Sequence, residues 1–160
     1  MSKRRQVRER VLQALYAREL SGDDAEHVLA TLIQPTFKGE PTYLRFAEKL
    51  FVRALDVRGE ADVLIARHVE NWELDRLALT DRLVLLMAIA ELLTFEDIPP
   101  KVTINEALEV AKTFSTDKSG AFVNGVLDAV LRELQETGRL KKTGRGLVET
   151  SVGGGRRPRG

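Results

Sequence analysis

The chain has 160 residues, enough for one domain or for two small subdomains that share a core. It contains no cysteine, which excludes a disulfide framework, a thiolate zinc site, an iron–sulfur cluster and a cysteine nucleophile. The longest apolar run, residues 83–90, is far shorter than the roughly 20 residues that span a bilayer. The first residues also lack the apolar core of a signal peptide, so we expect a cytoplasmic protein without a membrane segment.

Charge is unevenly distributed along the chain. Residues 1–10 hold five cations and Glu9, a balance of +4, and residues 139–160 hold seven cations and Glu149, a balance of +6. Because the whole chain carries +1, the body between them, residues 11–138, carries −9. Basic ends favour a polyanionic partner and an acidic body favours a basic protein partner, although basic tails also serve solubility alone.

Apolar residues recur at helical spacing through the first half of the chain. The pattern predicts helices over 3–20, 24–34 and 42–58, followed by a break at Gly59 and a further helix to about residue 70. Gly22 ends the first of these helices and Pro35 ends the second. Residues 73–78 are expected to form one short helical turn.

The second half is also helical. Residues 80–95 are apolar nearly all round, which predicts a central buried helix with Thr80 as its N-cap. Pro99 and Pro100 predict a loop. Thr103 and Glu106 then fit a capping box that starts a helix, whose inward stripe ends at Phe114.

A polar loop over 115–120 and a last helix over 120–137 complete the predicted body. Residues 138–160 contain seven of the twelve glycines and no aromatic residue, so we expect a disordered tail over 139–160. No stretch alternates as a strand does. The sequence therefore predicts an all-α fold of about seven helices, with a domain over 1–138 and a disordered Gly/Arg-rich tail over 139–160.

Residues suited to catalysis are few. His27 and His68 are the only histidines and do not have metal-ligand spacing. No nucleotide-binding glycine loop and no nucleophile motif is present. We therefore expect no enzyme, no metal site and no cofactor.

The first helix carries a stronger functional signal, because its first two turns hold five cations. Helix dipoles disfavour cations at this end, which favours a functional role over an incidental basic surface. Arg4 and Arg8 are four residues apart and are expected to share an exposed face, while Val7 faces the core. Tyr16 would extend that face as a platform on which an RNA base stacks.

Phe122 is a second candidate for stacking. It is expected at the start of the last helix, beside the polar loop, while Val123, Val126 and Leu127 already fill the inward stripe. Ordinary packing of this side chain is the alternative.

Four segments together resemble the NusB family of bacterial transcription antitermination factors. They are RRQVRERVLQALY at 4–16, DRLVLLMAIAEL at 81–92, IPPKVTINEALEVAKTF at 98–114 and FVNGVLD at 122–128. The resemblance implies an all-helical fold of two small subdomains. It also implies that the chain binds boxA RNA together with the small-subunit ribosomal protein NusE. The pair would join an antitermination complex on RNA polymerase and support ribosomal RNA synthesis and maturation.

The resemblance also assigns site residues. An RNA-binding motif falls on Arg4, Arg5 and Arg8, with Gln13 and Tyr16 further along the helix. A second RNA patch falls on Ser119 and Phe122, and a NusE contact falls on Asp81. On this assignment Arg8→Ala would weaken RNA binding and leave the helical fold intact.

Three other functions are alternatives, and each makes a different demand on the sequence or on binding. A protein-interaction module with nonspecific RNA affinity would show no preference among RNA sequences. A NusB-like domain of an RNA methyltransferase would need a following domain that binds the methyl donor. A small acid–base hydrolase would need carboxylates that converge in one pocket, and no spacing predicts them.

Overall fold

The structure is a computed structural model that describes residues 2–69 and 77–147. These residues form α-helices and no strand, which confirms the all-helical prediction. The α-helices are α1 (Lys3–Ser21), α2 (Ala25–Val28), α3 (Pro41–Asp56), α4 (Arg58–Arg67), α6 (Leu79–Thr94), α7 (Pro100–Phe114) and α8 (Asp117–Glu136). A π-helical turn (Leu29–Ile33) continues α2, and a 3-10 turn (Gly144–Leu147) ends the described part of the chain.

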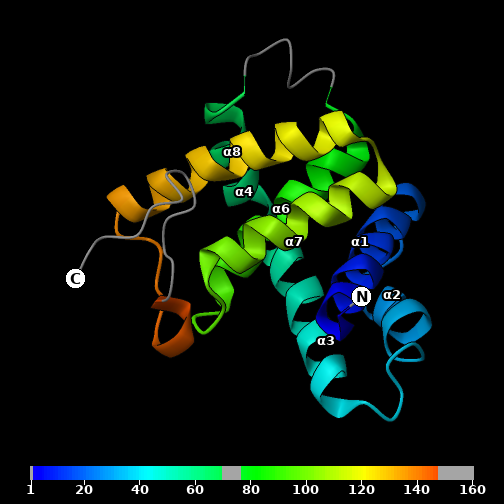
Figure 1. Ribbon diagram of the computed structural model, residues 1–160. Coiled ribbons are helices and arrows are strands. Elements are labelled where there is room, and N and C mark those ends of the chain that lie inside the picture. Colours follow the sequence, from blue (N-terminus) through cyan, green and yellow to red (C-terminus); the bar gives the residue numbers. More distant parts are fainter. Residues whose placement is uncertain (1, 70–76, 148–160) are drawn as a thin grey trace.

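Helix α6 lies at the centre of the molecule. It contacts α1, α3, α4, α7 and α8, and every side chain from Leu83 to Leu92 is buried. Figure 1 shows α1, α2 and α3 gathered on one side, with α7 and α8 running side by side on the other. The prediction of a central buried helix is therefore confirmed.

The first helix begins and ends as its sequence predicts. The Ser2 hydroxyl accepts a hydrogen bond from the backbone N–H of Arg5, and the chain leaves the helix at Gly22 with a φ of 75°. A positive φ at this position favours glycine, because it has no Cβ.

The predicted starts of α7 and α6 are wrong. Helix α7 begins at Pro100, three residues before the predicted capping box, because proline fits a first turn whose N–H groups lack partners anyway. The side chains of Thr103 and Glu106 bind other helices instead. Helix α6 is preceded by Ala78 without a side-chain cap, so Thr80 lies inside the helix.

The last helix begins earlier than predicted. The Thr116 hydroxyl accepts a hydrogen bond from the N–H of Ser119, which starts α8 at Asp117 inside the predicted loop. The predicted short turn over 73–78 lies almost wholly outside the described residues.

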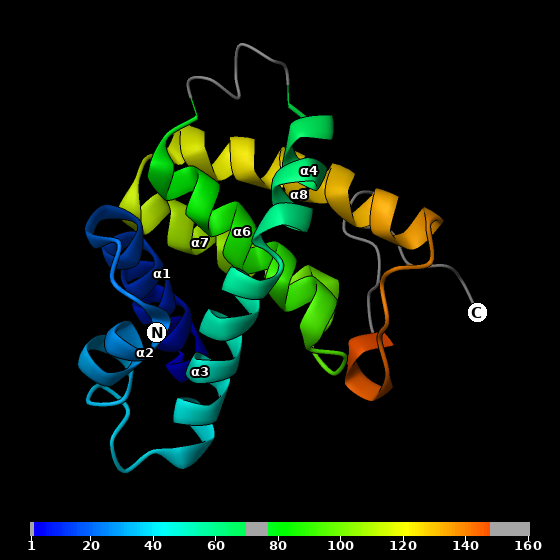
Figure 2. The same cartoon turned by 180° about the vertical axis from the view of Figure 1, so that it is seen from behind.

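The chain after α8 packs against the body as far as residue 147. Leu140 contacts the core, Lys142 Nζ donates to the Phe95 carbonyl at 2.7 Å, and Thr143 N–H donates to the Glu96 carbonyl at 2.9 Å. Figure 2 shows the turn at 144–147 beside the loop that joins α6 to α7. Backbone and lysine hydrogen bonds to one loop thus hold this segment although it has few apolar residues, and the domain boundary at 138 stays a prediction. Residues 148–160 lie outside the described part.

Candidate functional site

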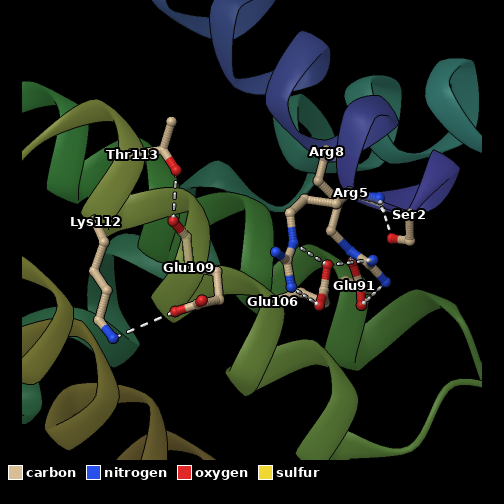
Figure 3. A network of polar contacts seen from close by, with 8 residues as sticks. All are labelled: Ser2, Arg5, Arg8, Glu91, Glu106, Glu109, Lys112 and Thr113. Carbon is tan, nitrogen blue, oxygen red and sulfur yellow. Dashed lines mark hydrogen bonds and ion pairs between the residues drawn. The ribbon is translucent and has the colours of Figure 1, made fainter.

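Arg8 is buried between α1, α6 and α7. Its Nε donates to Glu91 Oε1 at 2.7 Å and its Nη2 to Glu91 Oε2 at 2.9 Å, a bidentate pair (Figure 3). Thr103 donates a further hydrogen bond to Glu91, and Glu106 lies 3.6 Å from Arg8 Nη1. Only 2% of Arg8 is exposed, so the prediction that it shares an exposed face with Arg4 is wrong. Arg8 is buried because the Glu91 carboxylate on α6 is buried too, and a buried carboxylate requires a cation beside it.

Arg5 lies beside this buried pair and nearer the surface. Its Nε and Nη2 donate to the two oxygens of Glu106 at 3.0 and 2.7 Å (Figure 3). Hydrogen bonding from Arg5 holds the pKa of the Glu106 carboxyl below its ordinary value, although burial acts in the opposite direction. The Arg5 guanidinium is therefore only partly available to a ligand.

Arg4 is exposed at the start of α1. Its guanidinium carbon lies 5.2 Å from the centroid of the Phe46 ring, a cation–π contact, and it has no carboxylate partner among the described residues. It lines a hollow of about 470 Å³ at the loop between α6 and α7. The other lining residues are Asp97, Ile98, Pro99, Val102 and Arg145.

Gln13 and Tyr16 line a different hollow, of about 520 Å³, further along α1. Its walls are mainly apolar, and Tyr16 is 39% exposed and Phe114 37% exposed. The remaining lining residues are Leu12, Ala17, Leu20 and Thr80. An apolar hollow with two accessible aromatic rings has the chemistry to accept a flat ring such as a nucleobase.

Asp81 and Ser119 meet between α6 and α8. The Ser119 hydroxyl donates to Asp81 Oδ2 at 3.0 Å, while the buried Oδ1 has no hydrogen-bond partner in the described part of the chain. Burial raises the pKa of the Asp81 carboxyl, and the bond from Ser119 counteracts this. The Ser119 hydroxyl also lies 2.8 Å from that of Ser115, so it already has partners within the protein.

Phe122 is half-buried and packs against the core from the second turn of α8. Its contact with the core fits the alternative of ordinary packing, and stacking of its exposed part on an RNA base stays a prediction. Because α8 begins at Asp117, Phe122 lies further into the helix than expected.

The structure thus divides the predicted site residues among separate places. Arg4 lines one hollow, Gln13 and Tyr16 line another, Arg5 and Arg8 bind carboxylates, and Ser119 binds Asp81. Sequence reasoning missed Leu20 and placed Phe114 in the buried stripe. The available sequence signal was their position in the last turn of α1 and of α7. A neighbouring helix often ends at such a position and leaves the apolar side chain uncovered.

The part of the chain that the structure describes has no cluster of metal ligands and no membrane-spanning helix, and both of its histidines lie near carboxylates. No group of three or more histidine, aspartate or glutamate side chains there has the geometry to hold a metal ion. His68 contacts Glu133 at 2.7 Å, and His27 is exposed near Asp23. Within residues 2–69 and 77–147, none of the helices has both the length and the hydropathy to span a bilayer.

Comparisons with known proteins agree on one family. The model of the NusB family matches residues 5–132. The chain is 50% identical over 148 residues to transcription antitermination protein NusB of Salinibacter ruber, covering 92% of each chain. It is 43% identical to the protein of that name from Chloroherpeton thalassium, covering 91% of this chain and 69% of the relative.

Solved structures show the same likeness. NusB from T. maritima superimposes with a TM-score of 0.75 at 37% identity, covering 83% of this chain and 93% of that one. A crystal structure of the antitermination factors NusB and NusE in complex with double-stranded RNA superimposes with a TM-score of 0.73 at 25% identity. That match covers 83% of this chain and 99% of the other.

Proposed function

The chain belongs to the NusB family, and from this premise we propose that it is a transcription antitermination factor that binds boxA RNA together with NusE. The observation that carries the proposal is the 50% identity to a NusB protein over almost the whole of both chains. In this role the protein joins an antitermination complex on RNA polymerase and supports ribosomal RNA synthesis and maturation. It acts by binding rather than by catalysis, in the cytoplasm, where the transcript is made.

The hollow at Gln13 and Tyr16 is the proposed site for RNA bases. Single-stranded RNA is recognised through splayed bases that stack on aromatic rings and through phosphates that pair with arginines. Tyr16 and Phe114 supply accessible rings, and Gln13 supplies an amide at the rim. Arg4 and the exposed part of Arg5 supply charge at the start of the same helix.

Arg8, Ser119 and Phe122 have positioning roles in this proposal. Arg8 holds α1 against α6 and α7, and Ser119 holds the start of α8 against Asp81. Phe122 packs α8 onto the core. None of the three needs to touch RNA for its loss to weaken RNA binding.

NusE is the proposed protein partner, and Asp81 is the proposed contact. NusE is a ribosomal protein, a class that is usually basic, and the body of this chain carries −9. Asp81 is 7% exposed, and its buried Oδ1 has no partner among the described residues. A basic group on the partner would reach this oxygen only if the contact between α6 and α8 opened on binding, and it would then supply the missing interaction.

The test is binding of a short boxA-like RNA and a scrambled control, each at two salt concentrations, with and without NusE. Selective binding that NusE tightens supports the proposal. Phosphate contacts from Arg4 and Arg5 would give a salt slope of about −1.4 for a single strand. Equal binding of both RNAs, unchanged by NusE, would overturn it in favour of an interaction module with nonspecific RNA affinity.

A further inference from the structure

The hollow at Arg4 has a second arginine that comes from the other end of the chain. Arg145 lies in the turn Gly144–Leu147, which packs beside the loop between α6 and α7 (Figure 2). Three hydrogen bonds define this arrangement: Lys142 to the Phe95 carbonyl, Thr143 to the Glu96 carbonyl, and Gly146 to the Thr143 carbonyl. Arg145 therefore has a defined place although the segment is glycine-rich.

Arg4 and Arg145 are both exposed and have no carboxylate partner among the described residues. This separates them from most arginines of the structure, which pair with aspartate or glutamate. Those paired arginines are Arg5, Arg8, Arg53, Arg58, Arg67, Arg82 and Arg139. Two guanidinium groups without carboxylate partners in one hollow of about 470 Å³ make a site that favours anions.

The remaining walls of the hollow fit a nucleic-acid backbone better than an isolated anion. Ile98, Pro99 and Val102 form an apolar surface against which a ribose or a base can lie. Helix α7 begins at this surface, and the positive end of its dipole adds to the charge of the arginines. Asp97 is the one carboxylate among the lining residues and opposes them.

We infer that this hollow, between Arg4 and Arg145, binds the phosphate backbone of single-stranded RNA and extends the RNA-binding surface to the C-terminal segment. The inference rests on the proposed function, because Arg4 belongs to the helix assigned to RNA. It goes beyond that function, because Arg145 lies outside residues 5–132, which the family model matches. The C-terminal segment of this chain is then part of its RNA site.

The test compares Arg145→Gln with Lys141→Gln. Both variants remove one positive charge from one exposed segment, but Lys141 does not line the hollow. Binding is measured with boxA-like RNA extended by flanking nucleotides, over a range of salt concentrations and without NusE. We expect Arg145→Gln to weaken binding by about three- to tenfold and to reduce the salt slope by about 0.7, the value for one phosphate contact. Lys141→Gln leaves the slope unchanged.

A third variant makes the net charge of the hollow more positive, whereas Arg145→Gln makes it less positive. Asp97→Asn removes the opposing carboxylate and should tighten binding of the extended RNA. Circular dichroism of each variant checks that the helices are intact.

The outcomes separate this inference from the proposed function. If the wild-type protein binds boxA-like RNA selectively but Arg145→Gln and Lys141→Gln behave alike, the hollow does not bind RNA and the proposed function stands. NusE binding of each variant is measured separately; if Arg145→Gln weakens binding of NusE and not of RNA, the hollow is a protein-docking surface and the inference is wrong. If the wild-type protein shows no selective binding of boxA-like RNA even with NusE, both fall.

Discussion

The guanidinium of Arg8 forms two hydrogen bonds with the carboxylate of Glu91, at 2.7 and 2.9 Å, and both side chains are almost completely buried. The two residues are 83 positions apart and join the first helix to the central one. Thr103 donates a further hydrogen bond to Glu91 from α7. One buried ion pair therefore fixes the relative positions of α1, α6 and α7, the helices that form the hollow at Tyr16.

Arg8→Ala should destabilise the fold. Removing one partner of a buried ion pair leaves the other charge unpaired in the core, which typically costs about 3–5 kcal/mol. We expect a loss of that size in the free energy of unfolding, measured by urea denaturation. Arg4→Ala is the matched control and should change stability by about 0.5 kcal/mol or less, because Arg4 is exposed.

A double variant shows whether the unpaired charge is the cause. Arg8→Met combined with Glu91→Leu removes both charges and should recover much of the lost stability. If Arg8→Ala instead has the stability of the wild-type protein and only loses RNA affinity, the sequence-based assignment of Arg8 to RNA is correct and the structural role is wrong.

Periodicity predicted the helices well because each one buries an apolar stripe. It could not place Arg8, since Val7, Arg8 and Val11 all face inward and the carboxylate that permits this is remote in sequence. Likewise the capping-box pattern at Thr103 and Glu106 is real as a sequence pattern. Its two side chains bind Glu91 and Arg5, so only the packed structure shows which hydrogen bonds prevail.

Glu106→Gln should change how stability depends on pH. Hydrogen bonding from Arg5 lowers the pKa of Glu106 below its ordinary value of 4.5. The lowered pKa stabilises the folded state above pH 4.5, and this contribution is lost as the pH falls through the pKa of the folded state. We therefore expect the wild-type protein to lose its stability advantage over Glu106→Gln as the pH is lowered. Denaturation at several pH values measures this, and Glu109→Gln, whose partner Lys112 is exposed, is the control. Parallel curves for wild type and Glu106→Gln would contradict the prediction.

Asp81→Asn should stabilise the folded state at neutral pH, whereas Glu106→Gln should destabilise it. Burial raises the pKa of Asp81 above its ordinary value of 3.8, so the folded state binds this proton more readily than the unfolded state does. Ionised Asp81 therefore costs stability at neutral pH, and the cost disappears as the pH falls through the raised pKa. We expect Asp81→Asn to be more stable than the wild-type protein at pH 7 and equal to it in acid.

The same variant, Asp81→Asn, should bind NusE more weakly, which titration calorimetry measures. Higher stability with unchanged NusE binding would remove Asp81 from the proposed interface.

Tyr16→Ala should weaken RNA binding with little effect on stability. Stacking on an aromatic ring contributes about 1–3 kcal/mol per base, so the dissociation constant should rise by about tenfold or more. Tyr16→Phe keeps the ring and should bind nearly as the wild-type protein does. Fluorescence anisotropy with labelled RNA measures both. Equal losses in the two variants would mean that the hydroxyl, not the ring, makes the contact.

Gly146→Ala should release the C-terminal segment from the body. A Cβ at Gly146 would overlap the carbonyl oxygen of Glu96, a backbone atom that cannot move aside as a flexible side chain can. The backbone hydrogen bond from Thr143 to that carbonyl should then be lost. Hydrogen exchange reports it directly, as reduced protection of the Thr143 amide while α6 and α7 keep theirs. Gly144 has a positive φ but open space around it, so Gly144→Ala is a control that strains the backbone without this overlap.

Gly146→Ala should also weaken binding of extended RNA as much as Arg145→Gln does, because Arg145 reaches the hollow only while the segment is packed. Loss of Thr143 protection with full RNA affinity would show that the segment's position is not needed for RNA binding.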